Sequence, residues 1–358
     1  MNAAVKTARI PTIVLGGTGY VAGELLRLIA GHPQLELTAI LSDSQPGSSV
    51  GAAFGHLAPV YPQTKFSSLA EVTELVAKLP VSAIFSAAPH GAAAALIDSL
   101  LTRAEAAGTK PHVVDISADF RYTTDAAYAA VYKHAHGAPA RLAQFTCAVP
   151  EHLAVSPTRH VAHPGCFATA ILLAAVPLLK LGFVTPQLFV AGVTGSTGSG
   201  RKPTEGTHHP QRHSDLYSYN ALAHRHTPEV VACALSATGV AAEINFVPHS
   251  GPIARGIHVT VQATLSRPAT TQELVAALQQ FYAHSPFIAV SDQAPRVKDV
   301  VGSNYARLGL ASNGRSVAVM SVLDNLNKGA AGGAVQWMNR LLDLPETSGL
   351  TAPAAGWT

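Results

Sequence analysis

The sequence predicts an α/β protein built from a Rossmann-type, doubly wound parallel sheet and a second, α+β domain whose sheet is largely antiparallel. Three observations predict it. An apolar run ends in a glycine-rich turn that opens a helix within residues 12–30. Apolar runs then alternate with helical segments as far as residue 117, which is typical of a parallel sheet. From Gln187 onward the runs alternate in polarity and are rich in β-branched residues, which favours antiparallel pairing.

Length and composition limit the class of protein. The chain has 358 residues, which indicates about two domains, and 48% of them are apolar, as in a globular protein with ample core. A net charge of +3 provides no basic face for nucleic acid or membrane, so we expect small-molecule partners. Three cysteines do not make a disulfide framework, and neither a signal peptide nor a membrane span is recognisable. We therefore expect a cytoplasmic protein.

The first strand and the glycines after it form a dinucleotide fingerprint. Gly17, Gly19 and Ala22 match G-x-G-x-x-G/A between a strand at residues 12–15 and an amphipathic helix. Glycine there permits a tight turn and a close approach to pyrophosphate, whereas the alternative is a plain glycine turn. We expect cofactor contacts from Gly16, Gly17, Thr18, Gly19, Tyr20 and Val21.

The second strand, residues 35–41, ends where a cofactor ribose should arrive. Asp43 could accept a hydrogen bond from the 2′-hydroxyl of NAD. Ser42 and Ser44 could instead donate to the 2′-phosphate of NADP. The local chemistry leaves the choice between NAD and NADP open.

Two further strands should end at the same edge of the sheet. Residues 81–88 lead into Pro89 and His90, and residues 112–117 lead toward Arg121. Because the carboxyl ends of parallel strands face one crevice, both loops should face the cofactor. Arg121 could clamp a phosphate or carboxylate there, or be an ordinary surface arginine.

Cys166 lies between a Pro-Gly turn and a long apolar helix. A helix N-terminus favours negative charge, so this position predicts a lowered thiol pKa and a reactive thiolate. A buried structural cysteine is the alternative reading of the same local pattern. We interpret Cys147, between apolar neighbours in a short strand, as a core residue.

A polar segment, residues 195–230, should be one long loop, and such loops are uncommon unless they are functional. One of its histidines placed against Cys166 would form a nucleophile and acid/base pair. Its histidines lack the ligand spacing of a zinc site, so we expect no metal. They are His208, His209, His213, His224 and His226.

The end of the chain should return to the first domain. Gly329 and small residues open a helix at 330–342, a pattern that suits a nearby phosphate or nicotinamide. We expect a dinucleotide-binding domain at residues 1–165, completed by a C-terminal helix within 326–345. Residues 166–325 should form the catalytic and oligomerisation domain.

A dinucleotide fold, a cysteine at a helix start and a histidine-bearing segment together describe a phosphorylating aldehyde dehydrogenase. The motifs go further. In order and along nearly the whole chain, the sequence resembles the N-acetyl-γ-glutamyl-phosphate reductase family of arginine biosynthesis. The motifs that carry this resemblance are GGTGYVAGEL, DISADFR, HPGCFATA, GSTGSGRKP, HRHTPE and DNLNKGAAGGAVQ.

The resemblance implies NADPH-dependent reduction of an acyl phosphate to a semialdehyde through a cysteine thioester, in a homodimer or homotetramer. It implies that Cys166 is the nucleophile and His226 the acid/base group, with Glu229 beside it. For the substrate it indicates Arg121, Ser117, Arg201, Lys202 and His224. For NADP it adds Ser42, Ser44, Pro89, His90, Ser196, Gly198, Asn325 and Gly329.

The chain departs from the family at the nucleophile, where NPGCY is usual and His163 and Phe167 stand here. A lost tyrosine hydroxyl and a gained imidazole change the hydrogen-bonding groups near the thiol. Alternatives to the predicted function are the same chemistry on aspartyl phosphate or an aminoadipyl phosphate, and a nucleotide-sensing regulator without catalysis. The sequence leaves the oligomeric state and the residues that recognise the acetyl group undetermined.

Overall fold

The computed structural model describes residues 9–356, and within them the predicted fold class is confirmed. The first sheet has six strands in the order β2-β1-β3-β4-β6-β5, and every pairing is parallel. Its strands are β1 (Ile10–Leu15), β2 (Leu35–Ile40), β3 (Ala83–Ser86), β4 (His112–Asp115), β5 (Phe145–Cys147) and β6 (His160–Ala162). Their buried, β-branched side chains explain why helices cover both faces.

The second sheet is largely antiparallel, with two parallel pairings, β7 with β9 and β11 with β12. Its order is β11-β12-β13-β10-β7-β9-β8. The strands are β7 (Val184–Thr194), β8 (Tyr217–Ser218), β9 (Glu243–Ser250), β10 (Ile257–Leu265), β11 (Ile288–Ser291), β12 (Ala306–Ser312) and β13 (Ser316–Leu323). Buried and exposed residues alternate along the central strands, so one face of this sheet packs on helices and the other is open.

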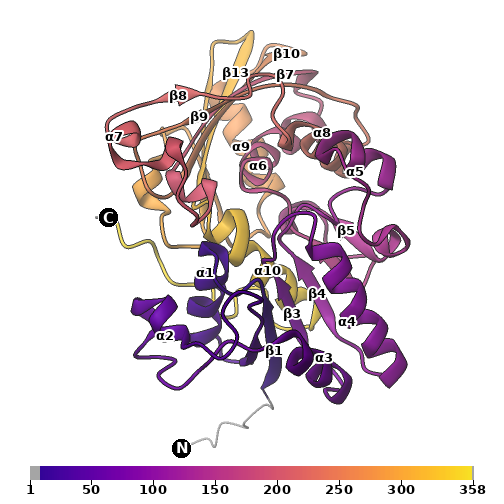
Figure 1. The fold of residues 1–358 in the computed structure, drawn as a ribbon. Helices are drawn as coiled ribbons and strands as arrows, with labels where there is room; N and C mark the ends of the chain where they lie inside the picture. Colours follow the sequence, from indigo (N-terminus) through magenta and orange to yellow (C-terminus); the bar gives the residue numbers. More distant parts are fainter. Residues whose placement is uncertain (1–8, 357–358) are drawn as a thin grey trace, which may run out of the picture.

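Helices cover both sheets, as Figure 1 shows. The α-helices are α1 (Tyr20–Ala30), α2 (Val50–Ala53), α3 (Leu69–Lys78), α4 (Ala93–Ala107), α5 (Asp125–Tyr132), α6 (Cys166–Lys180), α7 (His209–Arg212), α8 (His226–Thr238), α9 (Thr271–Phe281) and α10 (Gly332–Leu341). Short 3-10 turns are η1 (Gly55–Leu57), η2 (Pro139–Gln144), η3 (Pro150–His152), η4 (Ser196–Ser199), η5 (Glu205–Thr207) and η6 (Val297–Asp299). No helix among the described residues is long and apolar enough to cross a membrane.

Helix α6 forms the centre of the upper half. Every residue from Phe167 to Leu179 is buried, because the helix is apolar on all sides and packs between the second sheet and α8. Its first residue, Cys166, therefore stands at the end of a rigid, fully packed element. Cys166 is therefore held by the core rather than by a loop.

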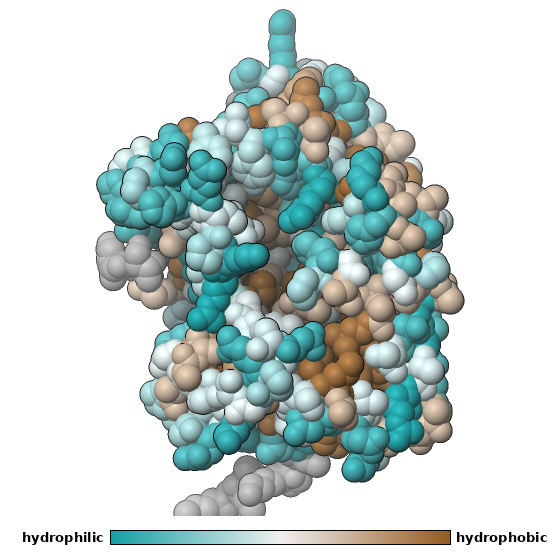
Figure 2. Space-filling model, in the orientation of Figure 1, coloured by the Kyte–Doolittle hydropathy of each residue, from teal (hydrophilic) through white to brown (hydrophobic). Residues whose placement is uncertain are grey.

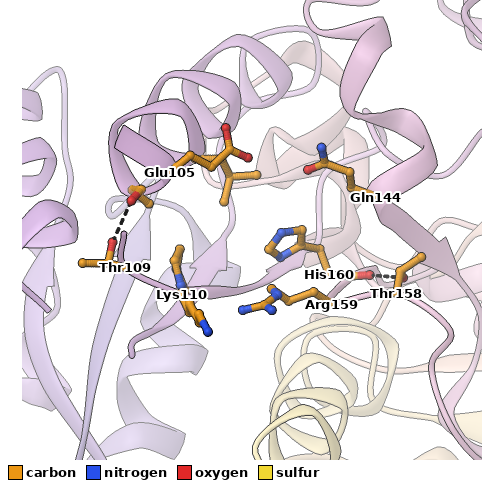
Figure 3. A pocket seen from close by; sticks show the side chains of 10 residues that line it. Glu105, Thr109, Lys110, Gln144, Thr158, Arg159 and His160 are labelled. Atoms are coloured by element: carbon orange, nitrogen blue, oxygen red, sulfur yellow. Dashed lines mark hydrogen bonds between the residues drawn. The ribbon is translucent and has the colours of Figure 1, made fainter. Parts of the chain in front are cut away.

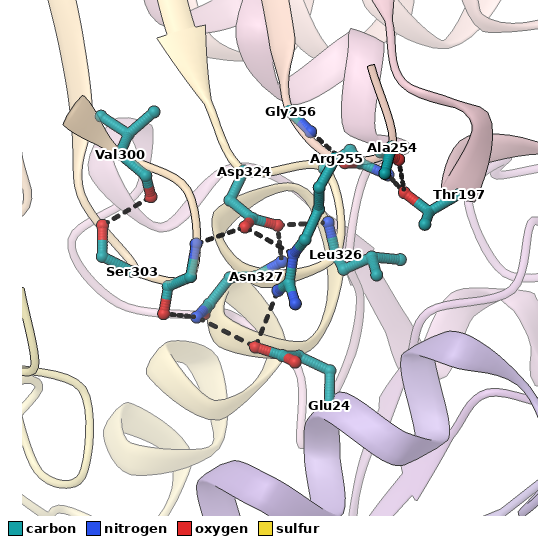
Figure 4. A network of polar contacts seen from close by, with 12 residues as sticks. Glu24, Thr197, Ala254, Arg255, Gly256, Val300, Ser303, Asp324, Leu326 and Asn327 are labelled. Carbon is teal, nitrogen blue, oxygen red and sulfur yellow. Dashed lines mark hydrogen bonds and ion pairs between the residues drawn. The ribbon is translucent and has the colours of Figure 1, made fainter. Parts of the chain in front are cut away.

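The C-terminal segment returns to the first sheet. Trp337 and Met338 of α10 belong to the same core cluster as α1 and the parallel strands, and α10 packs on β4. The helix begins at Gly332 and not at 330, because a single π-turn, η7 (Asn327–Ala331), precedes it. Figure 4 shows the polar network beside this turn, in which Arg255 binds both Asp324 (2.7 Å) and Glu24 of α1 (2.9 Å). These ion pairs connect α1, which packs on the first sheet, to residues that adjoin the second sheet.

The prediction of one long loop over residues 195–230 is wrong. The segment contains η4, η5, α7 and β8, and α8 begins inside it at His226. Pro228 occurs in the first turn of α8, where a missing N–H costs nothing, and Glu229 in that turn complements the helix dipole. His226 is therefore the first residue of a helix and not a loop residue.

Candidate active site

The predicted site segments follow the carboxyl ends of strands of the parallel sheet. Gly16 follows β1, Pro89 follows β3, and the turn that ends at Cys166 follows β6. Parallel strands place these ends at one edge of the sheet, which is where open α/β sheets bind ligands. Figure 2 shows that this face of the molecule is hollowed between its upper and lower parts.

The fingerprint turn leaves room for a ligand above α1. Gly16 has φ +76°, and a methyl group on it would lie 2.5 Å from the Ala87 carbonyl oxygen. A methyl group on Gly17 would meet the Ile40 side chain at 2.6 Å. Gly19, the N-cap of α1, has nothing within 4 Å of the same position, so the space beside this helix start is open. The turn fits a pyrophosphate.

Arg201 and Lys202 lie beside this turn. The Arg201 guanidinium donates to the Thr18 carbonyl oxygen (3.2 Å) and the Ala53 carbonyl oxygen (2.8 Å), and it lies 5.0 Å from the Phe54 ring centroid. A cavity of about 600 Å³ opens here, lined by Thr18, Gln45, Ser48, Ser49, Ala52, Ala53, Arg201 and Lys202. Arg201 and Lys202, which were predicted to bind the substrate, thus lie beside the turn that is predicted to bind the cofactor.

Cys166 is the first residue of α6 and keeps part of its surface exposed. A methyl group on Gly329 would lie 2.8 Å from Cys166 Cβ, so η7 packs directly on Cys166. Desolvation raises the pKa of the thiol, and the Phe167 N–H and Arg121 only partly oppose it. The prediction of a lowered thiol pKa is therefore wrong for the free protein: packing around the helix start outweighs the helix dipole.

A buried ion pair holds the turn before Cys166. Glu229 accepts a hydrogen bond from the Gly165 N–H (2.6 Å) and one from Arg121 Nη1 (3.0 Å). Arg121 also donates to the carbonyl oxygens of His163 (3.1 Å) and Ile116 (2.9 Å). Both side chains are almost completely inaccessible, so each charge is neutralised by the other.

His226 packs against the same turn. A methyl group on Gly165 would overlap His226 Nε2, which places this nitrogen against the residue before Cys166. Burial, together with Arg121, the neighbouring His224 and Arg225, lowers the pKa of His226 well below its usual value. His224 packs on it with ring centroids 4.8 Å apart, and its Nδ1 accepts the His226 N–H (3.2 Å). Both pKa shifts favour the uncharged forms of Cys166 and His226.

Relatives of known name share this chain over almost its whole length. The protein of Ectopseudomonas mendocina named N-acetyl-γ-glutamyl-phosphate reductase is 38% identical over 348 residues, 95% of this chain and 98% of its own. That of Symbiobacterium thermophilum, with the same name, is 38% identical over 352 residues, 94% and 96% of the two chains. The chain belongs to the N-acetyl-γ-glutamyl-phosphate reductase family.

Two family descriptions match the two parts of this family member. "Semialdehyde dehydrogenase, NAD binding domain" matches residues 12–136, and "Semialdehyde dehydrogenase, dimerisation domain" matches residues 166–325. Among solved structures, aspartate semialdehyde dehydrogenase II of Vibrio cholerae complexed with ASA has a TM-score of 0.68 at 15% identity, covering 94% of this chain and 99% of that one. The Candida albicans aspartate semialdehyde dehydrogenase with NADP has the same score, identity and coverage. At such low identity these structures show the fold alone.

His163 and Phe167, which depart from the reductase family's motif, both pack in the protein core. His163 is fully buried, and its ring lies against Gly333 at the start of α10. Burial, Lys328 and Arg121 lower its pKa to about 3, so it is a neutral packing group. Phe167 packs edge-on against Phe246 and His224, where a hydroxyl is not needed to fill the space.

Several residues that were predicted to contact the substrate or the cofactor form hydrogen bonds within the protein. Ser117 donates to Asp115 (2.7 Å), and His90 accepts the Ala118 N–H (2.9 Å). Asn325 bridges Thr197 (3.0 Å) and the Gly256 N–H (2.7 Å). These hydrogen bonds shape the crevice walls. The contacts of these residues with a ligand remain predictions.

The remaining predicted cofactor residues lie at the crevice rim. Ser42 Oγ lies 3.5 Å from Ser44 Oγ and accepts the Gln45 N–H (3.2 Å), which shapes the turn after β2. Ser196 and Gly198 form η4, which directly follows β7. Both turns present polar groups, and neither distinguishes NAD from NADP by geometry alone.

Arg225 was not predicted as a site residue. It stands between the two histidines of HRHTPE, as the exposed N-cap residue of α8. Its charge acts on the thiol of Cys166, on His226 and on His90 across the crevice. A positive charge near these groups suits an anionic leaving group. Its only sequence signal was its position inside that motif.

A different cavity, of about 400 Å³, opens where β4 and β6 begin (Figure 3). It is lined by Leu101, Ala104, Glu105, Thr109, Lys110, Pro111, Gln144, Thr158, Arg159 and His160. It therefore lies at the amino ends of the parallel strands, opposite the ligand-binding edge. None of the predicted site residues lines it. Among residues 9–356, no group of three or more side chains has the geometry of a metal site.

Proposed function

We propose that this protein reduces N-acetyl-γ-glutamyl phosphate to N-acetylglutamate 5-semialdehyde with NADPH, releasing phosphate, in arginine biosynthesis. One observation carries the proposal. Cys166, partly exposed at the start of α6, has the His226 imidazole against its preceding residue and follows the carboxyl end of β6, in the same parallel sheet whose β1 leads into the dinucleotide fingerprint. The substrate is supported by the names of relatives that are 38% identical.

The neutral state of both groups determines the first step. His226 takes the proton of the Cys166 thiol, and the thiolate attacks the acyl carbon. The Phe167 N–H, which points at the sulfur, and its neighbours at the start of α6 stabilise negative charge at this point. Phosphate leaves with the pair of electrons of its acyl bond, and a thioester remains on Cys166. Arg225, the N-cap of α8, would supply positive charge for the departing phosphate.

The fingerprint fits NADP, because the open N-terminus of α1 can accept a pyrophosphate and two cations adjoin it. Gly16 to Val21 would hold the pyrophosphate, while Arg201 and Lys202, with Ser42 and Ser44, would hold the 2′-phosphate. When bound, NADPH supplies the hydride that reduces the thioester. Cys166 then leaves as a thiolate, the aldehyde is released, and His226 returns the proton to the sulfur. The net proton consumed goes to the phosphate.

Arg121 and Glu229 act as positioning residues in this scheme. Their ion pair, and the Glu229 bond to the Gly165 N–H, orient the turn that carries the nucleophile. Breaking a buried pair leaves an uncompensated charge, which costs about 3–5 kcal/mol. Because Glu229 has both oxygens engaged, it is better suited to this task than to proton transfer.

We also propose that residues 1–165 with 326–345 form one domain and residues 166–325 the other, and that the protein is a cytoplasmic homodimer or homotetramer. The matched dimerisation domain supports oligomerisation. The open face of the second sheet carries Phe189 with 53% of its surface exposed, beside alternating small and polar residues. An apolar side chain on an open face suits a second copy of the chain. Three free thiols favour a reducing compartment.

The decisive experiment measures turnover in reverse, from N-acetylglutamate 5-semialdehyde, phosphate and NADP. Aspartate semialdehyde and aminoadipate semialdehyde serve as competing substrates in the same assay. We expect kcat/KM for the N-acetylated substrate to exceed both others by at least about a hundredfold. Higher turnover of either competitor would replace the proposed substrate, and no turnover of any would favour a regulator without catalysis.

A further inference from the structure

Glu24 is a buried carboxylate on α1, the helix that follows the dinucleotide fingerprint. Only 5% of its surface is exposed. It belongs to the motif GGTGYVAGEL, yet none of the proposed chemical steps uses it. Burial raises the pKa of Glu24, but Arg27 and Arg255 together lower it below its usual value, so the side chain is charged. The cofactor helix therefore buries a charge that the fingerprint itself does not need.

The Glu24 carboxylate is held by groups from other parts of the chain. Its Oε1 accepts hydrogen bonds from Arg27 Nη2 (2.6 Å) and Asn327 Nδ2 of η7 (3.3 Å), and it lies 2.9 Å from Arg255 Nη2. Arg255 Nε in turn donates to Asp324 Oδ2 (2.7 Å). Figure 4 shows Glu24, Arg255 and Asn327 directed toward one another. Glu24 thus connects α1 to η7 both directly and through Arg255.

Asp324 shapes η7, the turn that packs on Cys166. Its carboxylate accepts the N–H groups of Leu326 (2.8 Å) and Asn327 (2.9 Å), and its carbonyl oxygen accepts the Gly329 N–H (2.9 Å). Gly329 is the residue at which a methyl group would lie 2.8 Å from Cys166 Cβ. A continuous series of contacts therefore runs from α1 to Cys166.

The groups proposed for acylation reach Cys166 by a different route. His226 and Glu229 pack on the turn before it, at Gly165. Reduction of the thioester has an additional requirement: the cofactor and Cys166 must be held at a fixed separation, because hydride passes between them. Glu24 connects the elements that carry each of them. A change at Glu24 should therefore slow hydride transfer more than acylation.

We propose that Glu24 is a positioning residue, which fixes the separation between the cofactor turn at the start of α1 and Cys166 at the start of α6. The inference rests on the proposed function, which supplies the hydride donor and the thioester. Buried ion pairs often add little stability over apolar packing. The ion pairs of Glu24 instead set an orientation, and a misplacement of about 1 Å can cost about 10²-fold in rate.

The test measures the two chemical steps separately in Glu24→Gln, which keeps the size of the side chain and removes its charge. Rapid mixing with N-acetyl-γ-glutamyl phosphate, without cofactor, gives a burst of phosphate that reports acylation. A second mixing with NADPH gives a single turnover that reports hydride transfer. We expect the burst rate to stay within about threefold of the wild type, and the hydride rate to fall by about 10- to 100-fold. Glu74→Gln, in an exposed pair with Arg103, is the matched control and should change neither rate.

Measurements without turnover separate positioning from folding. Glu24→Gln should melt at a lower temperature, yet NADP should still raise that temperature, because the turn at Gly19 is unchanged. Alkylation of Cys166 by iodoacetamide should keep its wild-type rate. Glu24→Asp, which keeps the charge on a shorter side chain, should recover part of the hydride rate.

The proposal and the proposed function fail in different ways. An unchanged hydride rate in Glu24→Gln, equal losses in the burst and hydride rates, or loss of the stabilisation by NADP would each overturn the proposal. If Glu24→Gln does not fold, the same criteria apply to Glu24→Asp. A wild type that gives neither a phosphate burst nor NADPH oxidation would instead refute the proposed function.

Discussion

Two helices of this protein begin at the ligand-binding edge after a strand and a glycine turn, and they use the same helix start differently. Gly19 caps α1 and has open space above it. Gly165 caps α6, and His226, Arg121 and Glu229 surround it. The space beside the start of α1 is open, whereas the space beside the start of α6 is filled by side chains.

The difference shows that a helix N-terminus does not determine chemistry on its own. Where the space is open, the free N–H groups can bind the phosphates of a ligand. Where it is filled, desolvation raises the pKa of the Cys166 thiol despite the dipole. The filled turn therefore needs a base, and a neutral His226 is placed beside it.

Replacing the nucleophile should have the largest effect. Cys166→Ser puts a far weaker nucleophile at the start of α6, so reduction should fall below detection. NADP binding should remain, because the open turn at α1 is unchanged. Turnover is measured by NADPH absorbance, and NADP affinity by calorimetry. Undiminished turnover in this variant would contradict covalent catalysis by Cys166.

Replacing the base should come next. His226→Asn removes the proton acceptor, and we expect kcat to fall by about 10²- to 10⁴-fold. His208→Asn, in the same polar segment but outside the described contacts of the thiol, serves as the control and should change kcat little. Steady-state kinetics of both variants decide the point. Equal losses would mean that another histidine acts as the base.

The two capping glycines offer a matched pair. Gly165→Ala places a methyl group on His226 Nε2 and 2.9 Å from Arg121 Nη1, so kcat should fall by about a hundredfold while NADP still binds. Gly19→Ala meets no protein atom within 4 Å, so its melting temperature should change little while KM for NADP rises. Parallel melting and kinetic measurements test both. The comparison fails if Gly19→Ala leaves KM for NADP unchanged.

The sequence alone could predict whichever features depend on neighbouring residues. The strand, glycine turn and helix at residues 10–30 needed only local pattern, as did the placement of Cys166 at a helix start. The thiol pKa could not be predicted, because it depends on groups such as Gly329 and Arg121, far away in the sequence. Glu229 and Gly165 are 64 residues apart, and Arg121 and Glu229 are 108 apart.

Acid stability should show the smallest and most specific effect. His163 lies behind the filled turn, with its pKa lowered by burial to about 3, whereas an unfolded imidazole protonates near 6.5. The unfolded state therefore binds more protons below pH 6.5, and stability falls with pH by up to about 1.4 kcal/mol per unit. The contribution is fully present above 6.5.

His163→Asn, which restores the residue usual in the family, should remove this share of the acid sensitivity. Urea unfolding at pH 6.5 and pH 5 gives the free energy of unfolding of each protein. The wild type should lose about 2 kcal/mol more than the variant over this interval. Other buried histidines, such as His160 with a pKa of about 3, are common to both proteins, so their contribution cancels in the difference. Identical losses would mean that His163 is not held neutral, and that the filled turn does not exclude charge as its packing implies.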